Sequence, residues 1–101
     1  MRLEVRRWDG SGERTVAALR ARLESEGYSV FCWTDAPHAH YDAHAHANDE
    51  SIWLVSGAIT FGTDAGDFAL APGDRLMLPA GTRHTADAGP EGATYLIGEK
   101  R

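Results

Sequence analysis

Short segments rich in β-branched and aromatic residues follow one another from residue 28 almost to the end of the chain, and glycine, proline or aspartate interrupts them at intervals. Such segments are typical of strands, and this regular spacing is typical of a β-sandwich or barrel. We expect strands over residues 28–34, 41–46, 51–56, 58–62, 67–71, 75–79, 84–88 and 93–98. Turns are expected over 63–66 and 71–74, where glycine permits positive φ.

The first 27 residues have a different pattern. A short edge strand is expected before Asp9-Gly10, and apolar residues then recur at helical spacing within 13–26, before Gly27. The length of 101 residues leaves room for one compact domain. We therefore predict an all-β fold, a small β-barrel or jelly roll with one N-terminal α-helix. The single domain spans 1–101, with the strand and helix in 1–27 and the barrel in 28–98.

Charge and apolar content exclude several classes of function. The chain has 15 acidic and 10 basic residues, a net charge of −5, and its N-terminal arginines are interspersed with acidic residues. An acidic protein without a basic patch is a poor binder of nucleic acid. No apolar run approaches the roughly 20 residues that span a bilayer, and we expect a soluble protein without a signal peptide. Cys32 is the only cysteine, which excludes an intrachain disulfide and fits a cytoplasmic setting.

Four of the five histidines fall within the segment HAHYDAHAH. Alternate residues of a strand point to the same face, so His44 and His46 can bind one metal ion together. Glu50 can supply a third ligand, and His84 a fourth from across a barrel. These nitrogen and oxygen ligands suit Fe(II), Mn(II), Ni(II), Cu(II) or Zn(II), and the sequence does not choose among these ions.

The other two histidines of the segment have two interpretations. If the strand extends upstream, His38 and His40 share the face of His44 and lie with Asp42 at the mouth of a pocket. The alternative, which Pro37 favours, is a loop without a direct functional role. A histidine-rich stretch as a whole can also be solvated and purely structural.

The same alternation predicts the wall around the metal. Ile52 and Leu54 should face the interior, whereas Trp53 should face outward, toward a second layer or a partner chain. Trp53 is thus a candidate for an interface in a homodimer, together with the strand that contains Trp8. The further interior residues are expected to be Ile59, Phe61, Phe68, Leu70, Leu76 and Leu78. No catalytic role is assigned to Trp33, Tyr41, Arg83 or Tyr95.

Two separated blocks of the sequence resemble the two motifs of the cupins. His44-Ala-His46, Glu50 and Gly57 match the first motif, and Gly73, Pro79, Gly81 and His84 match the second. The resemblance covers roughly residues 28–98. It implies a small β-barrel in which the four residues His44, His46, Glu50 and His84 bind a divalent metal ion. The sequence departs from the motifs at His38, where cupins have glycine, and at Ala88, where they have asparagine; neither position is a ligand in the family.

The resemblance also suggests an activity. Three imidazoles and a carboxylate around an octahedral ion leave two adjacent positions open for water, substrate or dioxygen. Cupin dioxygenases are the nearest template for an enzyme acting on a small organic molecule, and the role of Glu50 as a base is implied by some relatives. The alternatives are a metal-dependent isomerase or lyase and a non-catalytic module that binds a small ligand or a metal.

Overall fold

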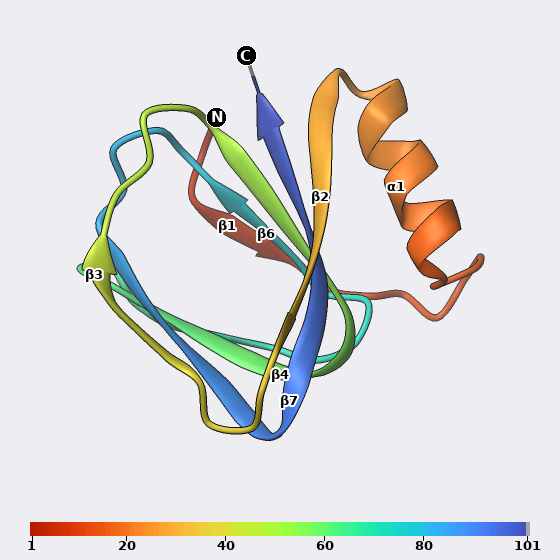
Figure 1. Cartoon of the computed structure of the whole chain (residues 1–101). Helices are drawn as coiled ribbons and strands as arrows, with labels where there is room; N and C mark the ends of the chain where they lie inside the picture. Colours follow the sequence, from red (N-terminus) through yellow and green to blue (C-terminus); the bar gives the residue numbers. More distant parts are fainter. Residues whose placement is uncertain (101) are drawn as a thin grey trace.

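The computed structural model describes residues 1–100, which form one helix and seven strands (Figure 1). In chain order these are β1 (Glu4–Arg6), α1 (Val16–Ser25), β2 (Tyr28–Asp35), β3 (His40–His44), β4 (Glu50–Thr63), β5 (Gly66–Leu70), β6 (Arg75–Leu78) and β7 (His84–Lys100). The predicted all-β class with one N-terminal helix is confirmed. None of the helical residues within 1–100 forms a segment long and apolar enough to cross a membrane.

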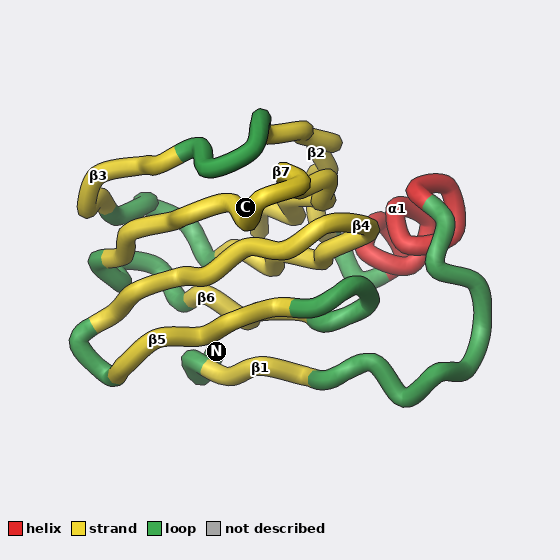
Figure 2. The backbone as a smooth tube through the Cα atoms, turned by 90° about the horizontal axis from the view of Figure 1, so that it is seen from below, coloured by secondary structure: helices red, strands yellow, loops and turns green. Residues whose placement is uncertain are grey.

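Two long strands, β4 and β7, organise the sheet. Each replaces two predicted strands, because residues 51–56 and 58–62 are continuous, as are 84–88 and 93–98. The two strands pair antiparallel along most of their length. β6 and β2 extend the sheet beside one half of the pair, whereas β5 and β3 extend it beside the other half. The result is the curved, two-layered barrel of Figures 1 and 2.

Glycines allow the long strands to bend at a shared position. The pairing of β4 with β7 shifts register on both sides of Gly57, as at a β-bulge. Gly57 and Gly92 both have a φ of 80°. A Cβ on Gly57 would overlap the carbonyl oxygen of Gly92, and a Cβ on Gly92 would overlap that of Asp35. Only glycine fits these positions, since other residues rarely adopt positive φ and no space exists for a side chain.

The core between the layers follows the predicted alternation. Ile52 and Leu54 are buried on the inner face of β4, together with Ile59 and Phe61 beyond the bend. The other predicted interior residues join the same cluster, with Phe68 packed at its edge: Phe68, Leu70, Leu76 and Leu78. The β4 face that lines the barrel is therefore set by a period of two, interrupted at the bulge.

The helix packs beside β2 and β7 and covers the outward-facing Trp53 of β4. It begins after Thr15, whose hydroxyl accepts a hydrogen bond from the Ala18 amide at 3.1 Å. Leu19 and Leu23 point inward and pack on Trp53, which is only 5% exposed. The prediction that Trp53 faces outward is correct, but its proposed place in an interface with a partner is wrong, because α1 of the same chain already covers it.

A buried arginine joins the helix to the sheet. The guanidinium of Arg75 donates to Ser51 Oγ at 2.5 Å and to Glu26 Oε1 at 2.8 Å. It also lies over the ring of Trp53, 4.8 Å from the ring centroid. The hydrogen bond to Arg75 lowers the pKa of Glu26, the residue that follows α1. The pair fixes the C-terminal end of the helix against β4 and β6.

The bend should tolerate no side chain. A positive φ costs a non-glycine residue about 1–2 kcal/mol, so Gly81→Ala, where φ is 77° and the space is open, should lose about that much. Gly57→Ala should lower the free energy of unfolding further, because its methyl group overlaps backbone. Urea unfolding of both variants measures the difference. Equal losses would show that the overlap is relieved without cost.

The predicted homodimer cannot use Trp53, because α1 covers this side chain. The other part of the expected surface is the strand before Trp8, which is β1 and lies at an end of the strand order β1-β6-β4-β7-β2. We expect a dimer in solution, and sedimentation equilibrium at micromolar concentration is the measurement. A monomer at that concentration would contradict the expectation.

Candidate metal centre

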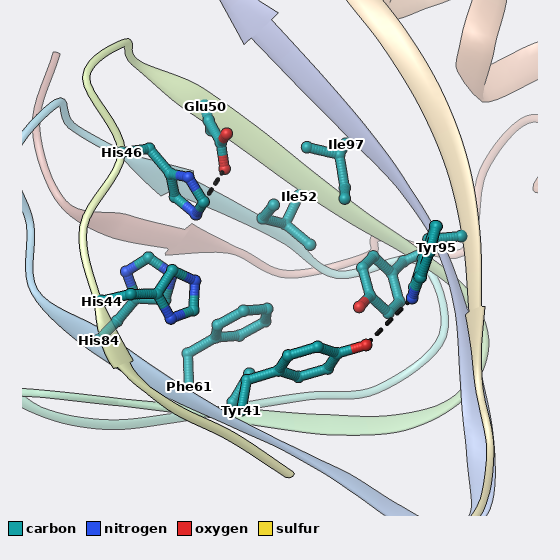
Figure 3. Close-up of a pocket in the computed structure, with 11 residues that line it drawn as sticks. Tyr41, His44, His46, Glu50, Ile52, Phe61, His84, Tyr95 and Ile97 are labelled. Carbon is teal, nitrogen blue, oxygen red and sulfur yellow. Dashed lines mark hydrogen bonds and ion pairs between the residues drawn. The ribbon is translucent and has the colours of Figure 1, made fainter. Parts of the chain in front are cut away.

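Three histidines meet at one end of the barrel. His44 ends β3, His46 lies just after it, and His84 begins β7. β3 and β7 pair so that His44 and His84 are direct partners. The ring centroids lie 4.4 to 5.2 Å apart, and one ligand atom from each ring lies within 4.8 Å of the others. The predicted meeting of distant histidines is therefore present (Figure 3).

The local backbone places His44 and His46 differently from the simple strand alternation. A register irregularity between Tyr41 and His44 lets both side chains line the same cavity. His46 lies outside the strand, and its carbonyl accepts a hydrogen bond from the Gly81 amide at 2.9 Å. Asp49 accepts another from the Ala80 amide at 2.7 Å. These two bonds tie the loop after β3 to the turn that precedes His84.

Backbone carbonyls fix which nitrogen of two histidines faces the cluster. Nδ1 of His44 lies 2.7 Å from the carbonyl oxygen of Asp42, and Nδ1 of His84 lies 2.9 Å from that of Thr82. A carbonyl oxygen only accepts, so each Nδ1 donates its hydrogen. In the neutral ring Nε2 then carries the lone pair, as in histidines that bind metal ions.

Burial favours the neutral form of two of these rings, His46 and His84. Desolvation lowers the pKa of His46 and His84, and the neighbouring His44 lowers both further. Neutral imidazole is the form that donates a lone pair to a cation. The donor set therefore fits a divalent transition metal ion.

Glu50 lies at the edge of the cluster. It is the first residue of β4, its side chain is 8% exposed, and its Oε1 is 3.6 Å from Nε2 of His46. Burial, and after it the charge of Glu99, raise the pKa of Glu50 to about 7. Glu50 lines the same cavity as the three histidines. It lies close enough to this cluster to act on the same small molecule.

The cavity has an aromatic end that sequence reasoning did not assign. Its volume is about 200 Å³. Besides the three histidines and Glu50 it is lined by Trp33, Tyr41, Ile52, Phe61, Ala86, Tyr95 and Ile97. In Figure 3 the histidines lie at one side, and Tyr41 and Tyr95 lie at the other. The sequence signal for this end was weak, because a tyrosine or tryptophan on a strand is more often part of a core.

A buried carboxylate holds the aromatic end together. Asp35, at the end of β2, is 5% exposed. It accepts hydrogen bonds from Nε1 of Trp33 at 2.9 Å, from the hydroxyl of Tyr41 at 2.5 Å and from that of Tyr95 at 2.7 Å. Burial and the hydrogen bond to Asp35 raise the pKa of Tyr95, so the phenol stays protonated. The one sequence feature that indicates this network is an aspartate, Asp35, two residues after Trp33 on the same strand.

The remaining candidates lie outside the cavity. His40 begins β3 but its ring is half exposed, between Asp87 at 2.6 Å and Asp42 at 3.0 Å. The hydrogen bond to Asp87 raises its pKa. The interpretation that placed His40 and Asp42 at the pocket mouth is therefore wrong, because the irregularity in β3 breaks the alternation. His38 lies in the turn after Pro37 with a φ of 61°, and Arg83 is exposed.

Known proteins share this fold. The family described as Cupin domain matches residues 25–97, and no curated protein sequence matches significantly. A cupin-2 domain containing protein from Shewanella frigidimarina is 21% identical, with a TM-score of 0.63 over 73% of this chain and 71% of that one. KdgF from Halomonas sp. is 26% identical, with a TM-score of 0.61 over 71% and 67%. A Cupin 2 conserved barrel domain protein from Salinispora arenicola is 18% identical, with a TM-score of 0.64 over 98% and 76%.

The Asp35 network should contribute measurably to stability. Asp35→Ala leaves the hydroxyl of buried Tyr95 without its acceptor, and an unsatisfied buried donor costs about 1–3 kcal/mol. We expect a loss of that size in the free energy of unfolding, measured by urea denaturation. Asp42→Ala is the control, because that side chain is fully exposed and its removal should change little. Equal stability of the two variants would contradict the role of Asp35.

Proposed function

This chain belongs to the cupin family, and from its histidine cluster we propose that it is a metal-dependent enzyme of the dioxygenase type that acts on a small organic molecule. The observation that carries the proposal is the arrangement of His44 and His84. Each donates Nδ1–H to a backbone carbonyl, which leaves Nε2 free for a cation. The conformational freedom of these two rings is thus already restricted before a cation binds.

The residues that would hold the ion are His44, His46, His84 and Glu50. When bound, a divalent Fe, Mn, Ni, Cu or Zn ion supplies Lewis acidity and, if it is redox-active, the capacity to use dioxygen. The protein supplies three imidazoles, one carboxyl group and a cavity whose other end is aromatic and aliphatic. A ligand that displaces water from this cavity would strengthen the electrostatic interactions made there.

Glu50 is proposed to have a second, catalytic role. Its carboxyl group faces the cavity beside His46, at the place where a small molecule would meet the cluster. In the ionised form it can accept a proton from an acidic substrate, and in the protonated form it can return that proton. The same side chain can thus serve as a ligand or as a base.

Metal binding is the first test. Zinc or cobalt titrated into metal-free protein should bind at one ion per chain. His84→Ala should weaken this binding by more than about 100-fold, because even the loss of an outer-shell partner costs about 10- to 100-fold. His40→Ala is the matched control and should bind as the unmodified protein does, since its ring lies outside the cavity. Equal effects of the two substitutions, measured by calorimetry, would contradict the proposed ligand set.

Activity is the second test. Iron-loaded protein is mixed with diketones, phenols or thiols while oxygen consumption is followed. Uptake that requires both His84 and Glu50 supports the dioxygenase. Conversion of a substrate without oxygen uptake would contradict the dioxygenase and favour an isomerase or lyase. Binding without conversion would leave a non-catalytic module that holds a small ligand or a metal.

A further inference from the structure

The aromatic end of the cavity has almost no free polar group to offer a ligand. Trp33 and Tyr95 each have one side-chain donor, and both donate to Asp35. Tyr41 donates its single hydrogen to the same carboxylate and lies 3.1 Å from Nε1 of Trp33. The other residues at this end, Ile52, Phe61, Ala86 and Ile97, are apolar. A ligand that reaches past the histidines therefore meets rings and aliphatic groups.

No positively charged side chain of residues 1–100 lines this end of the cavity. Among the residues within 1–100 that line the cavity, none is lysine or arginine. The acidic group at this end is Asp35, and Glu50 lies at the histidine end, in a chain with a net charge of −5. A second anionic group on the ligand would lose its hydration without gaining a partner, which is costly. The cavity thus disfavours diacids, phosphates and other molecules charged at both ends.

Two of the rings are exposed and yet held in place. Trp33 is 52% exposed and Tyr41 is 36% exposed, and both lie in the cavity wall. Their hydrogen bonds to Asp35 restrict the rings before any ligand binds. A ligand that packs against them therefore costs little additional conformational entropy of these side chains. Aromatic rings gain further from offset or edge contacts with another ring. Exposed rings fixed in this way suit contact with a flat partner.

We infer that the cavity selects an aromatic molecule with a single metal-binding head group and no second charged group: the head group lies at the histidines while the ring packs against Trp33 and Tyr41. The inference rests on the proposed function, because the head group needs the metal ion. Asp35 is the positioning residue of this site: it touches the two rings and not the ligand.

Two hydroxamates of the same head group and different tails test the substrate class. Zinc-loaded protein is titrated with acetohydroxamate and with benzohydroxamate by calorimetry. We expect benzohydroxamate to bind at least about tenfold more tightly, a difference of about 1.4 kcal/mol. The third probe, 4-carboxybenzohydroxamate, should lose most of this gain because its tail is charged. Equal affinity for the methyl and phenyl compounds would overturn the inference and leave the metal centre standing.

Matched variants on β2 separate ring contact from general apolarity. Trp33→Leu should weaken benzohydroxamate several-fold and leave acetohydroxamate unchanged. Phe31→Leu is the control, since Phe31 is equally exposed on the same strand but does not line the cavity. The same loss in both variants, or in neither, would contradict the assigned site. If neither hydroxamate binds the zinc-loaded protein, the proposed open metal centre fails, and the substrate class falls with it.

Discussion

The pairing of β4 with β7 is the constraint on which the rest of the molecule depends. Both strands run through the two halves of the barrel, and Gly57 and Gly92 let them bend together. Antiparallel pairing puts Glu50 and His84, the first residues of the two strands, at opposite ends of the ladder, and the bend of the barrel brings both to one cavity. β3 then pairs with β7 so that His44 faces His84. A site made from residues 40 positions apart in the chain thus follows from backbone pairing.

Hydrogen bonds prepare the two ends of the cavity for different ligand groups. At the histidine end, backbone carbonyls accept Nδ1–H from His44 and His84, so each ring presents a free lone pair. At the aromatic end, Asp35 accepts the hydrogens of its neighbours, so no donor is left over. One end is prepared for a cation and the other for an apolar surface. A molecule with a ligating head and an apolar ring matches both.

The barrel was predictable because its strands depend on local patterns, and the histidine cluster was predictable because two separated blocks resemble the cupin motifs. Alternation placed Ile52 and Leu54 inside, and motif spacing brought His84 to the cluster. The extent of β4 and β7 was not predictable, since a glycine such as Gly57 marks a turn and a bulge equally well. The packing of α1 on Trp53 and the hydrogen bond from Tyr41 to Asp35 are tertiary contacts. No periodic pattern in the sequence predicts them. A single irregularity in β3 was enough to move His40 to the surface.

The central claim is that three histidines hold one cation through Nε2. Anomalous diffraction from crystals of the zinc-loaded protein tests it most directly. We predict one strong peak per chain within bonding distance, about 2.0–2.1 Å, of Nε2 of His44, His46 and His84. A peak bound through Nδ1, a peak between His40 and the carboxylates of Asp42 and Asp87, or no peak at the cluster would contradict it.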